Sequence, residues 1–371
     1  MSTRPWSRRQ VLNTATGGGA VLGASALLGT GTAEAHGRTP ERDGHHGRGR
    51  REKIIAIEEA VILPGLITQG TALNGAIPFK PEVTADWFKR LPDITEYRLA
   101  DMDANGVTMQ VLSLTPPGVQ MQPDAAIAVR DAKVANDALA EIIAAHPTRF
   151  GGLAALPLQD PKAAVREAER AIRELGMGGF LVNGHTNGQY LDEPRFRQVW
   201  AALEDLGAAI YLHPTPAPAG DWDILKNRPE LVGPLYSWAA ETGGHALRVI
   251  VGGVFDDFPK AKLILGHMGE FLPFHASRLD VQIQNINTKV PLKRKPSEYL
   301  RRNIAITTSG VMDDTMLHAA IAVMGIDNVI FAIDYPFEKT AQAVGFLRGA
   351  KLSSAQRAKI AHGNAERLLH L

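Results

Sequence analysis

The sequence contains no cysteine among its 371 residues, which excludes disulfide bonds, thiolate metal ligands and a cysteine nucleophile. It also has no excess of positive charge, because 40 Lys and Arg residues are balanced by 39 Asp and Glu residues. A nucleic-acid-binding surface requires such an excess, so nucleic acid is not an expected partner. With 45% hydrophobic and 21% charged residues, the composition is that of a globular protein with a large core.

The N-terminal region has no apolar run suited to a stable membrane span, because its apolar stretch at residues 15–31 contains six glycines. This stretch follows the pair Arg8 and Arg9 and precedes an Ala-Glu-Ala sequence that ends at Ala35. The order predicts a twin-arginine signal peptide over residues 1–35 that is cleaved after Ala35. We therefore expect export to the periplasmic or cell-wall space or secretion, with no membrane association after cleavage. A disordered cytosolic tail is the alternative.

The stretch at residues 36–52 is rich in Gly, Arg and His and has almost no apolar residue, which predicts a disordered linker. From residue 53 onward, short apolar runs alternate with amphipathic helical patterns such as residues 161–176 and 194–207. We predict eight buried strands, at residues 54–57, 109–114, 150–157, 179–184, 208–214, 262–267, 304–309 and 329–334.

Eight alternating strand and helix units predict an α/β fold, a (β/α)8 TIM barrel over residues 53–371. An open, doubly wound sheet is the alternative. It is less favoured because no glycine-rich phosphate-binding fingerprint follows any predicted strand.

Ionisable residues stand at the ends of four predicted strands: Glu58, His213, His267 and Asp334. In a barrel, the carboxyl ends of the strands meet at one opening, so these side chains are expected to converge. Two carboxylates and two imidazoles suit a divalent metal ion. Each residue alone is compatible with a structural role, such as a helix N-cap, but their common position favours a metal or catalytic cluster.

Several motifs resemble the metal-dependent amidohydrolase superfamily, and within it the decarboxylase branch that includes γ-resorcylate and 2,3-dihydroxybenzoate decarboxylases. They extend over the chain after the linker and include LADMDANGVTMQVLSL, YLHP, LILGHMGE, ITTSG and FAIDYPFE. The resemblance implies a barrel of the metal-dependent hydrolase type.

The resemblance also implies roles for individual residues. Glu58, His213 and Asp334 would be metal ligands, and His267 with Glu270 would be active-site groups beside the metal. Binuclear hydrolases place a bridging lysine where this chain has Asn183, so a single divalent ion is expected, either Zn, Mn or Mg.

The first-strand motif Glu58-Glu59-Ala60 carries information on the subtype. The γ-resorcylate enzymes have histidine at the third position, whereas alanine resembles the 2,3-dihydroxybenzoate type and leaves room for a substrate oxygen or water. Two departures from the branch, Pro214-Thr215-Pro216 and Tyr335, lie near the expected substrate pocket and leave the substrate open.

The resemblance implies metal-dependent, non-oxidative decarboxylation of a hydroxybenzoate-like aromatic acid, in which Asp334 delivers the proton. The alternative is hydrolysis of a lactone, an amide or a C–C bond, with Asp334 as general base. A non-enzymatic binding protein is a third reading. The expected partners are a small aromatic or unsaturated carboxylic acid and further copies of the chain, as a homodimer or homotetramer.

Four other residues have open interpretations. Glu59 is expected either to be solvated or to support the metal ligands from behind, and a direct metal role is the less favoured alternative. Arg278 would contact a substrate carboxylate or pair with a nearer acid. Trp238 is expected in the core or an interface, and His185 on a loop surface or at the border of the pocket.

Overall fold

The computed structural model describes residues 52–63, 65–66, 77–218 and 222–371. The predicted signal peptide, and all but the last residue of the predicted linker, lie outside these ranges. In the part of the chain that is described, no helix is both long and apolar enough to cross a bilayer.

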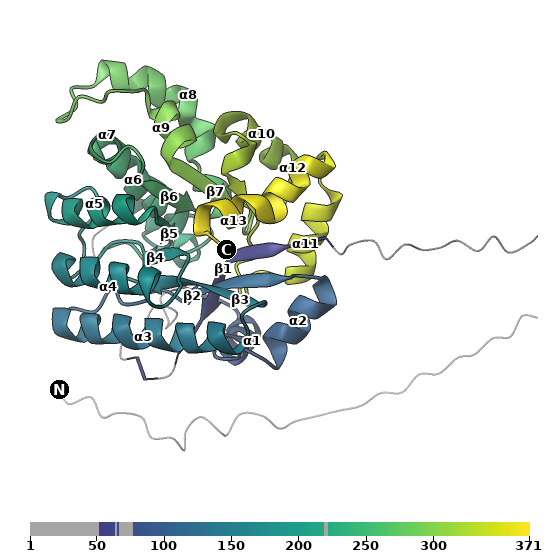
Figure 1. Cartoon of the computed structure of the whole chain (residues 1–371). Helices are drawn as coiled ribbons and strands as arrows, with labels where there is room; N and C mark the ends of the chain where they lie inside the picture. Colours follow the sequence, from purple (N-terminus) through teal and green to yellow (C-terminus); the bar gives the residue numbers. More distant parts are fainter. Residues whose placement is uncertain (1–51, 64, 67–76, 219–221) are drawn as a thin grey trace, which may run out of the picture. The chain divides into compact units, whose positions relative to one another are not determined.

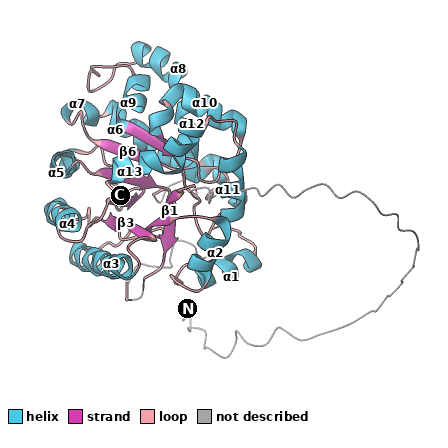
Figure 2. Cartoon of the chain, turned by 45° about the vertical axis from the view of Figure 1, so that its right-hand side comes forward, coloured by secondary structure: helices cyan, strands magenta, loops and turns pink. Residues whose placement is uncertain are grey.

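Eight parallel strands form one sheet in which each strand pairs with the next one along the chain. This order confirms the predicted TIM barrel. Figure 2 shows the strands at the centre of the fold with helices around them. The strands are β1 (Ile55–Val61), β2 (Met109–Leu114), β3 (Phe150–Ala155), β4 (Gly179–Asn183), β5 (Ala209–His213), β6 (Lys262–Leu265), β7 (Ile304–Thr307) and β8 (Val329–Ile330).

Helices surround the strands (Figure 1). The two helices predicted most clearly from sequence are present, and the first begins where the Asp160 side chain accepts hydrogen bonds from the amides of Lys162 and Ala163. The helices are α1 (Pro81–Arg90), α2 (Tyr97–Asn105), α3 (Ala125–Ala145), α4 (Pro161–Arg173), α5 (Arg197–Leu206), α6 (Ser237–Val251), α7 (Val254–Asp257), α8 (Leu272–Gln282), α9 (Pro296–Asn303), α10 (Asp314–Met324), α11 (Thr340–Gly349), α12 (Ser354–Ala358) and α13 (Asn364–Leu369).

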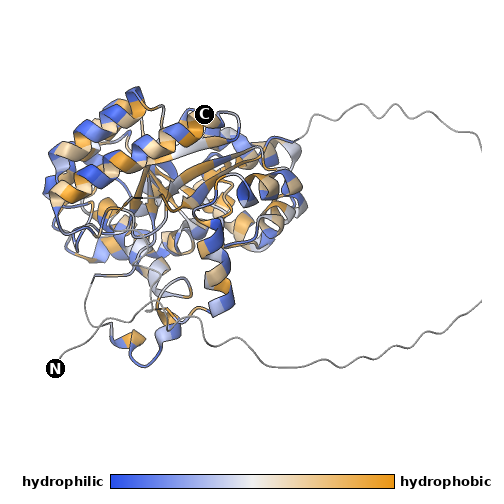
Figure 3. Ribbon diagram, turned by 90° about the horizontal axis from the view of Figure 1, so that it is seen from below, coloured by the Kyte–Doolittle hydropathy of each residue, from blue (hydrophilic) through white to orange (hydrophobic). Residues whose placement is uncertain are grey.

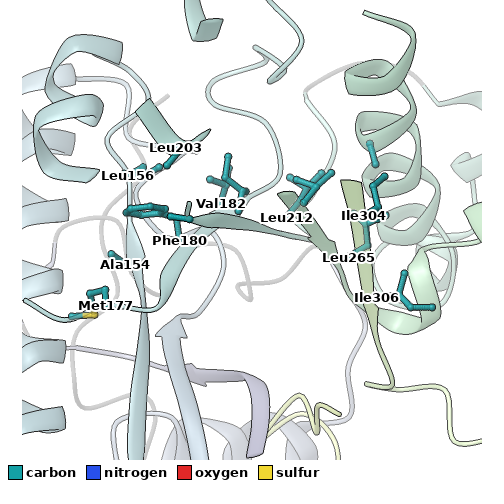
Figure 4. Close-up of a cluster of buried hydrophobic side chains, with 14 of the residues drawn as sticks. Ala154, Leu156, Met177, Phe180, Val182, Leu203, Leu212, Leu265, Ile304 and Ile306 are labelled. Carbon is teal, nitrogen blue, oxygen red and sulfur yellow. The ribbon is translucent and has the colours of Figure 1, made fainter. Parts of the chain in front are cut away.

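The core has two apolar layers because side chains alternate along each strand. In β4, Leu181 belongs to the cluster inside the barrel, whereas Phe180 and Val182 pack outward against the helices (Figure 4). The strands are therefore hydrophobic on both faces, and the helices combine apolar and polar residues (Figure 3).

The last helix, α13, covers the end of the barrel at which the strands begin. Its residues Ala365, Leu368 and Leu369 join the interior apolar cluster. Gly178, just before β4, permits the close approach, because a Cβ there would lie 2.7 Å from the carbonyl oxygen of Leu369. With this end covered, the opposite end is left for a functional cavity.

The strand β2 has the predicted bounds, and β3 to β7 end one or two residues earlier than predicted. The ends of β1 and β8 differ by four residues. The first was expected to end at residue 57, but β1 continues to Val61 through a β-bulge, where the register shifts between Ile57 and Glu59. The eighth was expected to reach residue 334, but β8 ends at Ile330, after which the amide of Phe331 bonds to the carbonyl of Ile360.

Candidate metal and active site

The four strand-end residues predicted from the sequence converge at one end of the barrel. Nε2 of His213 lies 3.6 Å from Oε1 of Glu58, and Nε2 of His267 lies 3.7 Å from the same oxygen. Nε2 of His267 also lies 3.5 Å from Oδ2 of Asp334. These distances leave space for one small ion between the groups.

Glu58 reaches this cluster because of the β-bulge. Its backbone has a positive φ of 87°, which turns its side chain toward β7, where Oε2 accepts a hydrogen bond of 3.1 Å from the hydroxyl of Thr307. Gly266 provides the space, because a Cβ at that position would lie 2.7 Å from Oε1 of Glu58. Glu58 is only 1% exposed, so its charge requires a partner.

His213 ends β5 and is oriented by the backbone. Its Nδ1 lies 2.9 Å from the carbonyl oxygen of Pro214, to which it donates, so Nε2 carries the lone pair that faces Glu58. Burial lowers the pKa of His213 to about 4, so the imidazole is neutral at physiological pH. A neutral imidazole with a free nitrogen is a metal ligand.

His267 and Glu270 form a pair beside the cluster, on the turn η4 (His267–Gly269) and the residue that follows it. Nδ1 of His267 lies 2.7 Å from Oε1 of Glu270. Burial opposes protonation of His267, but the charges of Glu270 and Glu58 outweigh it and raise its pKa well above the ordinary value. Burial also raises the pKa of Glu58 and of Glu270. A bound divalent cation would favour the ionised carboxylates and the neutral imidazole.

The cluster fits a divalent metal ion. Ligand atoms of Glu58, His267 and Asp334 all lie within 4.8 Å of one another. Among the described residues, Oε1 of Glu58 and Oδ1 of Asp334 are buried without a hydrogen-bond partner, as expected for oxygens that face a cation. The sequence named His213 rather than His267 as the nitrogen ligand. Both imidazoles face Glu58, so the predicted ligand set remains a prediction.

A cavity of about 450 Å³ opens beside the cluster. One part is ionisable, with His213, His267, Glu270, Asp334 and Glu338 in its lining. The remaining lining includes apolar and aromatic side chains, here called the apolar wall, with Phe79, Val83, Trp87, Val311 and Phe337. No lysine or arginine from the described part of the chain lines it. A flat apolar ring with one anionic end would match this division.

Two site residues were missed by sequence reasoning. Trp238 was expected in the core or an interface, but it lines the cavity, and its indole N–H has no hydrogen-bond partner among the described residues. Glu338 lines the cavity as well, and burial, with the nearby charge of Asp334, raises its pKa. The DYPFE motif contains Glu338 and was the one signal that pointed to it.

Other predicted residues lie outside the cavity. Arg278 is exposed on α8 and does not line it. His185 is buried, not on a loop surface, and its Nε2 lies 3.0 Å from the carbonyl oxygen of Pro216. Ala60 packs with Trp87 and Leu91 and does not line the cavity.

Glu59 is fully buried, so the expectation of a solvated side chain is wrong. Its two oxygens accept hydrogen bonds from the amides of Ile333 and Tyr335, on either side of Asp334. Glu59 therefore holds the backbone behind a predicted metal ligand.

Comparison with known proteins agrees with this geometry. The family model described as Amidohydrolase matches residues 38–371. The chain belongs to the amidohydrolase family. It is 39% identical over 329 residues to a γ-resorcylate decarboxylase from Rhizobium sp. (strain MTP-10005), covering 85% of this chain and 98% of that protein. The family and decarboxylase-branch resemblance predicted from the sequence is confirmed.

Solved structures show the same amidohydrolase barrel. A 5-carboxyvanillate decarboxylase from Sphingomonas paucimobilis matches with a TM-score of 0.79 and 41% identity, covering 86% of this chain and 99% of that one. A dihydroxybenzoic acid decarboxylase from Polaromonas sp. JS666, solved with bound manganese and the inhibitor 2-nitroresorcinol, matches with a TM-score of 0.80 and 38% identity, covering 86% and 97%.

Proposed function

We propose that this amidohydrolase is a metal-dependent, non-oxidative decarboxylase of a hydroxybenzoate-like aromatic acid. The observation that carries the proposal is the composition of the cavity lining, which combines the apolar wall with two imidazoles and several carboxyl groups. An aromatic ring would pack against Trp87 and Phe337, and its carboxylate would point toward Glu58, His213 and Asp334. Relatives at this level of identity that act on ortho-hydroxylated benzoates support the same class of substrate.

Glu58, His213 and Asp334 would hold one divalent ion, with His267 within reach of the same site. When bound, the ion would fix the substrate carboxylate and the neighbouring phenolic oxygen and neutralise their charge. Carboxylate and imidazole ligands without thiolate suit Mn, Zn or Mg, and the relative solved with manganese makes Mn the first ion to test. Asn183 in place of a lysine supports a single ion.

Asp334 is the proposed proton donor. After taking up a proton from solvent, its carboxyl group would transfer that proton to the ring carbon that bears the carboxylate, which interrupts the aromatic system. The electron pair of the breaking C–C bond then returns to the ring as CO2 leaves, and Asp334 is reprotonated from solvent. His267, held by Glu270, would bind the substrate hydroxyl and keep the ring in register.

Hydrolysis of a lactone, an amide or a C–C bond remains the competing chemistry on this barrel. To decide between them, the metal-reconstituted protein is given a panel of ortho-hydroxybenzoates, carboxymuconate-type acids, lactones and amides. Release of CO2 with the hydroxyarene as product is the expected result. Acid release or ring opening without CO2 would overturn the decarboxylase proposal.

Two further proposals concern the whole chain. Export through the twin-arginine route rests on the N-terminal motif alone. Assembly into a homodimer or homotetramer is compatible with large apolar side chains exposed outside the core and the cavity, such as Phe274, Val281 and Ile286. Light scattering of the purified protein tests the assembly, and a monomer at micromolar concentration would contradict it.

A further inference from the structure

The closure of the barrel between β8 and β1 depends on a side chain. Because β8 ends at Ile330, the chain from residue 331 to 335 meets β1 through separate bonds rather than a regular ladder. The amide of Ile57 donates to the carbonyl of Phe331 over 3.2 Å, and that of Ala60 donates to the carbonyl of Tyr335 over 2.8 Å. These two backbone bonds hold only the two ends of the segment.

Glu59 fills the gap between those bonds. Its Oε1 accepts a hydrogen bond of 3.1 Å from the amide of Ile333, and its Oε2 accepts one of 3.2 Å from the amide of Tyr335. The residue between these two amides is Asp334, whose backbone has a positive φ of 72°. An aspartate in this left-handed region is strained, so surrounding contacts must hold it there.

Arg98 supports the same segment from behind. It is fully buried, and its Nη2 donates a hydrogen bond of 2.7 Å to the carbonyl of Ala60, while its guanidinium lies 4.4 Å from the centre of the Tyr335 ring. Nη1 donates to Oε1 of Gln110 over 2.9 Å. Arg98 thus joins the residue after Glu59 to the residue after Asp334. Burial raises the pKa of Glu59 well above its ordinary value, and the amides of Ile333 and Tyr335 and the charge of Arg98 act in the opposite direction.

We propose that Glu59 is a positioning residue. Its hydrogen bonds fix the backbone on both sides of Asp334, so that the carboxyl group of Asp334 faces the cavity. Arg98 stabilises this arrangement, which we call the clamp. Glu59 does not line the cavity and acts only through Asp334. The inference rests on the proposed role of Asp334 as metal ligand and proton donor.

Glu59→Gln tests the clamp without a change in size. Two carboxylate oxygens accept from two amides, but a glutamine has one acceptor oxygen, and its NH2 group would face an amide N–H. We expect Asp334 to lose its fixed position, so that both Mn2+ affinity and kcat fall by about 10- to 100-fold. KM for the best hydroxybenzoate should change less, because the apolar wall is untouched.

Asn364→Asp is the matched control. Asn364 is also buried, and its Nδ2 donates to the carbonyls of Ile326 and Val329, at the opposite end of β8. The substitution is equally conservative in shape and also places a side chain of the wrong polarity against backbone groups. It should reduce the melting temperature as Glu59→Gln does, but leave Mn2+ affinity and kcat per folded molecule close to those of the parent.

The measurements are Mn2+ titration calorimetry, thermal unfolding and steady-state kinetics on the same preparations. If Glu59→Gln does not fold, Arg98→Lys is used, since it keeps the charge but loses the paired contacts, and it should show a smaller loss of the same kind. If the folded variant tested keeps the parental Mn2+ affinity and kcat, the inference is wrong while the proposed function stands. If the parent releases no CO2 from any acid, the proposed function fails, and the Mn2+ titrations alone decide for or against the clamp.

Discussion

Glu58 and Glu59 are adjacent in the chain, yet their carboxylates serve different parts of the barrel. Glu58 points toward His213 and His267, whereas Glu59 bonds to the amides of Ile333 and Tyr335. Adjacent side chains of a strand point to opposite faces, and the β-bulge between Ile57 and Glu59 adds one residue, so that Glu58 rather than Glu59 faces inward. Two consecutive acids can therefore supply one group to the cavity and one to the backbone behind it.

Asp334→Asn should weaken Mn2+ binding modestly but reduce turnover by at least about 10²-fold, because an amide can still coordinate but cannot donate the proton. Metal content, circular dichroism and CO2 release are measured on one preparation at saturating metal. Turnover near the parental rate would show that Asp334 is only a ligand, and the proton would have to come from His267 or water.

Glu58→Gln should abolish most of the increase in folding stability that bound Mn2+ provides. A ligand that binds only the folded state at 100 times its Kd adds about 2.7 kcal/mol. The variant should lose most of this gain, because the neutral amide removes negative charge that would balance the cation at a position only 1% exposed. The melting temperature is compared with and without Mn2+. Glu141→Gln, at an exposed position on α3, is the control and should keep the full Mn2+ shift. An equal shift in Glu58→Gln would exclude Glu58 as a ligand.

Glu338→Gln should widen the range of accepted acids. Glu338 lines the cavity near Asp334, so a second substrate carboxylate in this region meets like charge. Removal of the charge should lower KM for hydroxybenzene dicarboxylates by about tenfold, equivalent to about 1.4 kcal/mol, and change KM for monocarboxylates much less. Glu141→Gln again serves as control. Equal effects on both substrate classes would mean that Glu338 does not select by charge.

His245→Gln should reduce the acid sensitivity of the fold. His245 is 1% exposed, its Nε2 accepts a hydrogen bond from the amide of Leu191, and burial lowers its pKa to about 3. The unfolded chain binds a proton near the ordinary pKa of 6.5, so the folded state loses stability as the pH falls below this value. The loss between pH 7 and pH 5 is roughly 2 kcal/mol.

Glutamine keeps the acceptor for the amide of Leu191 but does not titrate. Between pH 7 and pH 5, the free energy of unfolding of the variant should therefore fall by roughly 2 kcal/mol less than that of the parent. Denaturant unfolding at both pH values gives the difference, with His318→Gln at an exposed position on α10 as control. A pH dependence identical to that of the parent would contradict the prediction.

Replacement of Arg8 and Arg9 by lysine should stop export in the native host, because the twin-arginine route recognises the arginine pair. The expected mature N-terminus is His36, established by sequencing of the secreted protein. Export at the parental level with two lysines would show that the pair is not the signal.

The barrel was predictable because every strand is an apolar run that ends in turn or polar residues, and the same pattern brought Glu58, His213, His267 and Asp334 together. The β-bulge was not predictable, because two successive glutamates do not reveal which of them faces inward. Trp238 was missed for a related reason: it lies on α6, and neither its spacing nor its residue type separates a cavity wall from a core. The role of Glu59 depends on the backbone of residues 333 to 335, which no side-chain pattern encodes.

The unequal charge of the cavity lining has a kinetic consequence. Glu270, Asp334 and Glu338 line the cavity and Glu58 lies beside it. Against these four carboxyl groups, the described lining contains no lysine or arginine, and His267, with its raised pKa, is its cationic group. A substrate anion therefore meets electrostatic repulsion until a divalent cation has entered. Under the proposed function, the divalent cation binds first and the organic acid second. The organic acid alone should therefore not raise the melting temperature of the metal-free protein.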